Sequence, residues 1–267
     1  MKQLKGNPVG IKQVIFDFFY YLSGGTFISF GILRQAQLGR NYFIYHGLGA
    51  SLITAAAYFF VGRSFLDQDT SYWIAASSIF MTLFSVTVSE RNRTPLASFF
   101  LGVLSILGAI VLEVTTIHPY PLHIPMILNA GLSTLLLGFS MNAMLLGHWY
   151  LVQPKLSINE LKRVCLVLIG LIVLRFVYGT YGLCNLIWGK SEMEIYRYLF
   201  ASSPGIFVIM RWFWGLLGPL ALAYPIWGTV KIRSTQSATG LLYVMVLFIV
   251  TGEILSLYLA AFFGMSL

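Results

Sequence analysis

Five ionisable side chains interrupt long apolar stretches of the chain and are the strongest candidates for chemistry. They are Asp17, Glu113, Arg175, Arg211 and Glu253. A charged side chain near the centre of a lipid bilayer costs roughly 3 kcal/mol or more, so such residues usually pair with one another or serve a ligand. We expect them either to fix helix packing as ion pairs, or to line a polar pocket for a quinone headgroup, an ion or a small anionic substrate.

The spacing of three of these charges places them at one level. Arg175 and Glu253 each lie 14 residues after the start of their apolar runs, 161–184 and 240–263. At 1.5 Å per residue this is about 21 Å along each helix, or about 9 Å from the far face of a hydrocarbon core about 30 Å thick. Arg211 lies six residues into a run that enters from that face, and the other two charges also fall toward it. If the charges form ion pairs, Arg175 or Arg211 can pair with Glu253, but depth along a helix does not fix its rotation, so this pairing is a hypothesis.

The elements that must position these charges are eight apolar runs, each close to the 20 residues that a spanning helix needs. Hydrophobic residues make up 58% of the 267 residues, charged residues make up 10%, and the mean hydropathy is +0.80. A soluble domain carries roughly 25% charged residues. We therefore predict an all-α fold, a polytopic transmembrane helix bundle that forms one integral membrane domain over residues 1–267. The runs are 13–34, 42–62, 71–89, 95–117, 124–148, 161–184, 205–230 and 240–263.

The formal net charge of +8 resides mostly in short connections between the runs. Lys and Arg in such loops set the orientation of a membrane protein and contact anionic lipid, so the lipid bilayer is the expected partner and nucleic acid is not. Nine basic residues follow odd-numbered runs and six lie on the other side, which favours cytoplasmic odd-numbered loops. The first run lacks a clear cleavage site and is interpreted as a retained helix in the cell (inner) membrane.

Two connections carry local signals of their own. The stretch 190–200 mixes charged and aromatic residues and is expected to form a partial helix that lies flat at the membrane interface. Ser157 followed by Glu160 is typical of a capping box at the start of the sixth run.

The histidines suggest two further sites. His46 and His148 lie near one face in different runs and could ligate a b-type haem, which needs two axial nitrogens from facing helices. Satisfied interfacial side chains are the alternative interpretation. His118 and His123 flank a proline-rich loop that could bind a metal or a partner, although an ordinary interfacial loop is the favoured interpretation.

Other signatures of catalysis or metal binding are missing. Cys165 and Cys184 are 19 residues apart, about 28 Å on one helix, so they form no disulfide and no metal-ligand pair. No phosphate loop, nucleophile elbow or metalloprotease motif occurs. We therefore assign no catalytic residue and no metal ligand.

The end of the chain resembles a known group of membrane proteins. The segment Arg211 to Pro219 in the penultimate run, followed by Gly252-Glu253 in the last, is similar to the membrane-anchor subunits of the polysulfide-reductase and DMSO-reductase type. Those anchors have about eight helices and pass electrons between a quinone pool and an attached iron–sulfur subunit. The resemblance implies a quinone-interacting subunit of an electron-transfer complex with iron–sulfur or cytochrome partners.

Three function hypotheses follow from these residues. In the first, the chain binds a quinone in a pocket in which Glu253 carries a proton. The residues expected to shape that pocket are Arg175, Arg211, Glu253 and Glu113. In the second, the same charged layer is the binding site of a small-solute or ion transporter. In the third, the charges only hold together a structural or assembly subunit.

Overall fold

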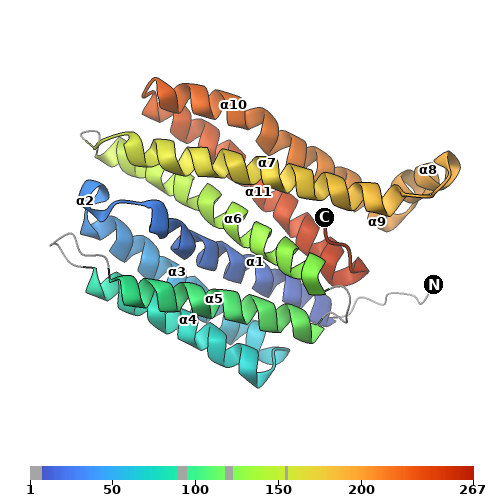
Figure 1. The fold of residues 1–267 in the computed structure, drawn as a ribbon, viewed down its shortest axis with the longest axis horizontal. Helices are drawn as coiled ribbons and strands as arrows, with labels where there is room; N and C mark the ends of the chain where they lie inside the picture. The colour runs from blue at the N-terminus through green and yellow to red at the C-terminus, as the bar shows by residue number, and fades with distance from the viewer. Residues whose placement is uncertain (1–7, 89–94, 118–122, 154–155) are drawn as a thin grey trace.

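A computed structural model describes residues 8–88, 95–117, 123–153 and 156–267, and those residues contain no strand (Figure 1). The predicted all-α fold is confirmed. The long helices are α1 (Pro8–Ser29), α3 (Arg40–Phe60), α4 (Gln68–Thr87), α5 (Leu96–Ile117), α6 (His123–Val152), α7 (Asn159–Ile187), α10 (Gly218–Lys231) and α11 (Thr235–Phe263). The shorter elements are α2 (Gln35–Leu38), α8 (Glu192–Ala201), α9 (Ser203–Met210), two 3-10 turns (Phe30–Ile32 and Gly62–Ser64) and a π-helix (Arg211–Leu217).

Seven helical segments of the described residues are long and apolar enough to cross a membrane, so the chain is a multi-pass membrane protein. They are Gly10–Ile32, Arg40–Ser64, Leu96–Ile117, Ile124–Val152, Asn159–Ile187, Ser203–Lys231 and Thr235–Phe263. The predicted count of about eight is corrected to seven by this standard, because the run 71–89 forms α4 and α4 is too polar to qualify. Serine and threonine residues make α4 more polar than the seven qualifying segments. Two of them, Ser78 and Thr82, form hydrogen bonds to Ser51 of α3 at 3.0 and 2.7 Å.

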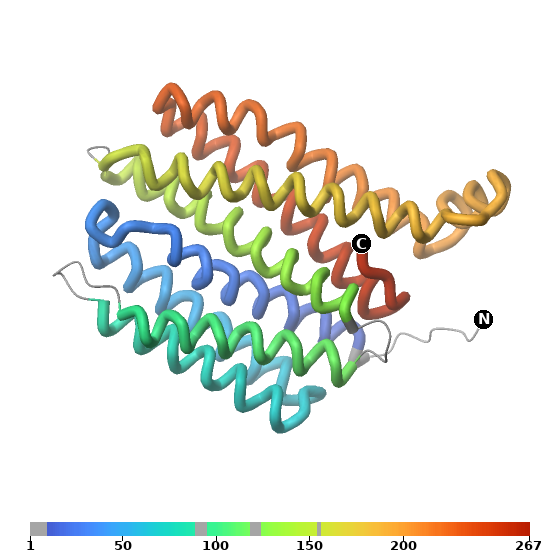
Figure 2. Tube along the Cα trace, in the orientation of Figure 1, coloured from blue at the N-terminus to red at the C-terminus, as the bar shows by residue number. Residues whose placement is uncertain are grey.

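The helix α4 nevertheless packs against α3 and α5 and runs along the bundle as they do (Figure 1). The start of α1 and the end of α11 meet at one end of the bundle, where a Cβ atom on Gly10 would lie 2.9 Å from the ring of Phe262 (Figure 2). Successive long segments alternate in direction, so the chain passes along the bundle an even number of times. The helix α4 runs beside the seven apolar segments but is not one of them. Which end faces the cytoplasm stays a prediction.

The helices α1 and α6 form the centre of the bundle (Figure 1). The apolar windows of these two helices are 67% and 56% buried, whereas the window of α3 is only 28% buried. On one side pack α3, α4 and α5, and on the other pack α7, α10 and α11. The outer helices present large apolar side chains outward, including Leu52, Phe60, Leu104 and Leu247. These surfaces require lipid as their solvent.

Small residues let α1 and α6 approach closely, as is usual for helix contacts in membranes. A Cβ atom added to Gly138 would lie 1.9 Å from the carbonyl carbon of Gly25, and one added to Gly25 would lie 1.8 Å from the carbonyl oxygen of Thr134. No side chain fits at either position without separating the two central helices.

The partial helix predicted within 190–200 is present as α8, which contains no buried residue, and its location at the membrane interface stays a prediction. Ser191 and Glu194 form its capping box, and the hydrogen bond from the Ser191 backbone N–H lowers the pKa of the Glu194 carboxyl. The other predicted capping box is wrong. The helix α7 has no side-chain cap, because Glu160 is fully buried and accepts a hydrogen bond from the backbone N–H of Arg34 at 3.0 Å.

The contact between α1 and α6 gives a test of the fold. Replacing Gly138 by alanine should destabilise the protein by about 1–3 kcal/mol, because overpacking forces the backbones apart. Gly131 on the same helix is the matched control, because a Cβ atom there meets open space. Thermal unfolding in mild detergent measures both variants. Equal melting temperatures for Gly138→Ala and Gly131→Ala would contradict the close approach.

Candidate functional site

Three of the predicted charges meet in the interior. Arg175 of α7 binds Glu253 of α11 through two parallel contacts, Nε to Oε1 at 3.1 Å and Nη2 to Oε2 at 2.7 Å. Arg211 of the π-helix donates from Nη2 to Oε1 of the same carboxylate at 2.8 Å. All three side chains are at most 1% exposed. The predicted pairing of arginine with Glu253 is therefore confirmed for both arginines, and we call these residues the charged cluster.

The carboxylate of Glu253 is saturated. Oε1 accepts from Arg175 and Arg211, and Oε2 accepts from Arg175 and from the hydroxyl of Ser133 at 2.6 Å. A carboxylate has about four lone-pair positions, so no position is left for a proton. The proton-carrying role expected for Glu253 does not fit this geometry, and Glu253 acts as the counter-ion of two guanidinium groups.

Arg175 is bound on every side that carries a donor. Besides Glu253, its Nη1 donates to Asn129 Oδ1 at 2.8 Å, and its Nη2 lies 3.1 Å from Ser133 Oγ and 3.0 Å from Ser256 Oγ. The hydroxyl of Ser256 donates in turn to the backbone carbonyl of Leu267 at 2.5 Å. A buried charge is tolerated when it is paired and its remaining donors are satisfied, and Arg175 meets both conditions.

Arg211 meets only the first condition. Its Nε and Nη1 atoms are buried without a hydrogen-bond partner among the described residues. The guanidinium lies where the π-helix crosses α11, since a Cβ atom on Gly215 or Gly252 would come within 2.4 or 2.6 Å of Nη1. An unsatisfied buried donor costs about 1–3 kcal/mol. π-Helical turns occur frequently at functional sites, so the costly arginine and the irregular helix mark the same position.

Asp17 and Glu113 lie in the same layer but outside the charged cluster. Asp17 on α1 is 5% exposed and Glu113 on α5 is 2% exposed. Both line a small cavity that is also lined by Asn129, the amide that binds Arg175. Glu113 was predicted to share a pocket with the three residues of the charged cluster, but it lies in this separate cavity. Asn129 connects the two places, because it lines the cavity and binds Arg175.

The two histidines considered for haem contact different partners. The imidazole of His46 packs against the ring of Tyr42 with centroids 4.3 Å apart and planes tilted by 39°, and its Nδ1 lies 2.7 Å from the Tyr42 backbone carbonyl. Trp149 of α6 lies beside it. His148 is exposed, and its Nδ1 lies 3.5 Å from the hydroxyl of Tyr243 on α11. The bis-histidine arrangement requires both rings to face one macrocycle, and these contacts do not direct them that way.

Metal ligands do not gather elsewhere in the part of the chain that the structure describes. No group of three or more His, Cys, Asp or Glu side chains occurs there. Cys165 is buried and Cys184 is exposed, and both are free thiols, as their spacing predicts. His118 and the rest of the proline-rich loop, 118–122, lie outside the described residues.

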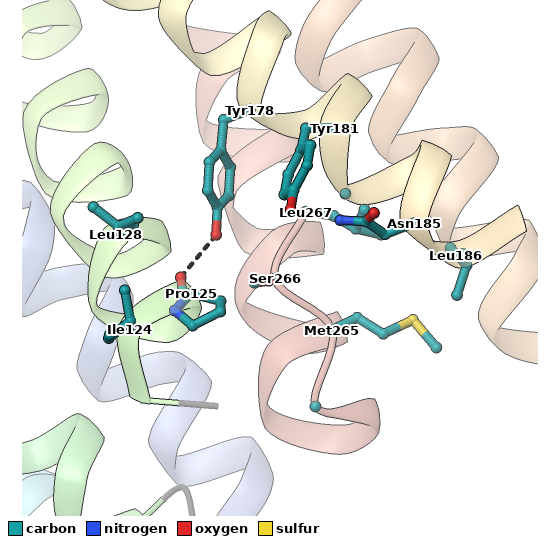
Figure 3. Close-up of a pocket in the computed structure, with 12 residues that line it drawn as sticks. Ile124, Pro125, Leu128, Tyr178, Tyr181, Asn185, Leu186, Met265, Ser266 and Leu267 are labelled. Carbon is teal, nitrogen blue, oxygen red and sulfur yellow. Dashed lines mark hydrogen bonds between the residues drawn. The ribbon is translucent and has the colours of Figure 1, made fainter. Parts of the chain in front are cut away.

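A pocket of about 490 Å³ opens beside the charged cluster, between α6, α7 and the segment 264–267 (Figure 3). Tyr178 of α7 forms its inner wall and donates a hydrogen bond to the Pro125 carbonyl of α6 at 2.7 Å. The Cζ atom of Arg175 lies 5.8 Å from the centre of the same tyrosine ring. The pocket and the charged cluster therefore share a wall.

Two polar side chains in this pocket have no hydrogen bond within the described ranges. Tyr181 and Asn185 lie four residues apart on α7 and so on one helix face, and both border the pocket (Figure 3). The rest of the lining is mainly apolar and includes Ile124, Leu128, Leu186, Met265 and Leu267. This site was not predicted from the sequence. The signal for it is a tyrosine and an asparagine four residues apart near the end of an apolar run, which places two polar side chains on one helix face.

Comparison of the chain with family models, with curated proteins and with solved structures finds no match. Its function has therefore to be inferred from the geometry of the site.

The two arginines should differ in what they contribute to stability. Arg175→Met should destabilise by about 3–5 kcal/mol, because it leaves a buried carboxylate with one remaining guanidinium contact and strands several polar groups. Arg211→Met should cost much less or be neutral, because a bidentate Arg175–Glu253 pair of zero net charge remains and two unpaired donor atoms disappear. Melting temperatures in mild detergent measure both.

The matched control for this comparison is Arg197→Met, which removes an exposed arginine of α8 and should leave the melting temperature nearly unchanged. A larger loss for Arg211→Met than for Arg175→Met would contradict the assignment of hydrogen bonds in the charged cluster.

Proposed function

We propose that this membrane protein binds a quinone-class molecule in the pocket between α6, α7 and the segment 264–267, as a membrane subunit of an electron-transfer complex. The observation that carries the proposal is the juxtaposition of this pocket, with its two unengaged polar side chains, and the buried charged cluster behind Tyr178. Arg175, Arg211 and Glu253 support the pocket from behind and do not line it.

The dimensions and lining of the pocket suit a quinone headgroup. Small-molecule sites typically enclose about 300–1,000 Å³ and combine apolar walls with a few polar groups that fix orientation. A quinone presents two carbonyl oxygens on a flat apolar ring, and the Tyr181 hydroxyl and the Asn185 amide can each donate to one of them. The exposed side chains of Ile124 and Leu128 at the rim face the surroundings, so an isoprenoid tail could extend into lipid.

The charged cluster gives the pocket a favourable electrostatic environment. Two guanidinium groups and one carboxylate leave a formal charge of +1. In an apolar interior such a charge acts over a longer distance than in water. Because Arg175 lies directly behind Tyr178, its field favours electron-rich carbonyl oxygens in the pocket.

The expected electron donor is a partner subunit of the iron–sulfur or cytochrome class. This part of the proposal rests on the resemblance of Arg211–Pro219 and Gly252-Glu253 to the polysulfide-reductase and DMSO-reductase type of anchor. Support comes from the contacts between these two segments, in which Arg211 binds Glu253 and Gly215 packs on Gly252. Purification in mild detergent followed by mass spectrometry would identify such a partner. Transport of a solute or ion is the other class of function, and the residues relevant to it are Asp17 and Glu113, which line a separate cavity.

Binding of a short-chain benzoquinone or naphthoquinone to the purified protein in lipid nanodiscs tests the proposal. Quenching of tryptophan fluorescence reports binding, since Trp188 directly follows α7 and is 85% exposed. Tyr181→Phe and Asn185→Leu should each weaken affinity about fivefold, because each removes one hydrogen bond worth about 1 kcal/mol.

Tyr224→Phe is the control, since this tyrosine is 88% exposed on α10 and outside the pocket, and its affinity should equal that of the unmodified protein. The proposal would be wrong if neither quinone bound, or if both pocket variants bound as tightly as the control.

A further inference from the structure

A second, much smaller cavity lies between α1, α5, α6 and α11. Its volume is about 20 Å³, which is enough for one water molecule, since a cavity needs roughly 10–15 Å³ for that purpose. Its polar lining consists of Gln13, Asp17, Tyr21, Glu113 and Asn129. A cavity of this size cannot take a quinone, and it is separate from the proposed quinone pocket.

Two carboxyl groups in this cavity each have an oxygen without a hydrogen-bond partner in the described part of the chain. The Oδ1 atom of Asp17 and the Oε1 atom of Glu113 are buried without a hydrogen bond among the described residues. Both carboxyls line the same cavity of about 20 Å³, and the side chain of Gln13 lines it with them. Like charges at such a separation in an apolar interior cannot both persist, so something positive must accompany the pair.

The formal charge of the whole buried layer leads to the same requirement. Arg175 and Arg211 contribute +2, and the three carboxyl groups of Asp17, Glu113 and Glu253 contribute −3, which sums to −1. An uncompensated charge in this environment is strongly unfavourable. One additional positive charge makes the layer neutral.

Glu253 cannot be the group that takes this charge, because its acceptor positions are filled by Arg175, Arg211 and Ser133. The carboxyl oxygens that lack a partner among the described residues, Asp17 Oδ1 and Glu113 Oε1, belong to side chains that line the acidic cavity. We infer that Asp17 and Glu113 form a proton-binding site that holds one proton between the two carboxyls, with room for one water molecule beside them. This site goes beyond the proposed quinone binding and does not depend on it.

A proton fits the cavity better than a metal cation does. Two carboxyls that line one small cavity bind most directly through a shared proton, as in enzymes whose paired carboxyls hold one proton. A dehydrated alkali cation requires several oxygen ligands around it, and one of the candidate oxygens, Asn129 Oδ1, already accepts a hydrogen bond from Arg175.

The groups that surround the pair come from every neighbouring helix. Tyr21 of α1 lines the cavity, Tyr20 of α1 and Asp67 before α4 are the other titratable groups near Glu113, and Arg175 of α7 reaches the cavity through Asn129 of α6. From α11 the cavity is lined by Leu257 and Ala260, which do not titrate. Arg175 is thus connected to the cavity by a single amide side chain, so a change in the charge of the pair acts on its guanidinium.

Infrared spectroscopy of the full-length protein in nanodiscs tests the inference directly. At neutral pH the spectrum should contain the C=O stretch of one buried protonated carboxyl, and the band should shift in D₂O. Asp17→Asn and Glu113→Gln should each abolish it, because the remaining carboxylate then balances the charged cluster without a proton. Asp69→Asn removes an exposed carboxylate and should leave the band unchanged. No band in the unmodified protein, or a band that survives in both single variants, would overturn the inference.

The melting temperature provides a second measurement that does not depend on the variants. The folded state holds a proton that the unfolded chain releases, so stability should fall as the pH rises above neutrality. The fall should be the same in sodium chloride and in choline chloride. A melting temperature that is independent of pH, or one that sodium restores at high pH, would overturn the proton assignment, and the second result would indicate a sodium site. Neither outcome affects the quinone-binding test, which uses a different pocket.

Discussion

The pairing of Arg175 with Glu253 is the interaction on which the rest of the interior depends. It joins α7 to α11 by a bidentate contact between two buried side chains, where a guanidinium or a carboxylate alone would be strongly unfavourable. The same contact recruits Asn129 and Ser133 from α6. One ion pair therefore fixes the relative rotation of three helices, which apolar packing alone leaves free, since lipid and apolar side chains are chemically alike.

Two features around this pair are not explained by stability alone. One is a second buried arginine, and the other is an excess of negative charge. Arg211 adds a second cation with unsatisfied donors, and the Asp17–Glu113 pair adds two acidic groups. Retained but costly features are expected at functional sites. Tyr178 lines the proposed quinone pocket and its ring lies beside Arg175, and Asn129 lines the acidic cavity and accepts a hydrogen bond from Arg175. A charge change in either cavity acts on the same guanidinium, which gives the two proposed binding events a physical route to influence each other.

The sequence predicts the helices and the level of the charges because both depend only on distance along the chain. Counting 1.5 Å per residue was enough to bring Arg175, Arg211 and Glu253 together. Distance along the chain does not give the rotation of each helix, so it did not predict that Asp17 and Glu113 line the same cavity. Nor could it show the π-helix, which arises where Gly215 meets Gly252 of another helix. Tyr181 in the pocket between α6, α7 and the segment 264–267 was not predicted, because tyrosine at the end of an apolar run is also typical of the membrane interface.

A double-mutant cycle on Arg175 and Glu253 tests the central claim most directly. The unfolding free energies of Arg175→Gln, Glu253→Gln and the double variant are measured in the same detergent. Residues in one ion-pair network are coupled by about 0.5–3 kcal/mol. We predict a coupling energy toward the upper end, with the double variant more stable than the sum of the two single losses implies. Additive losses would mean that the two side chains do not interact, and would contradict the account of the interior given above.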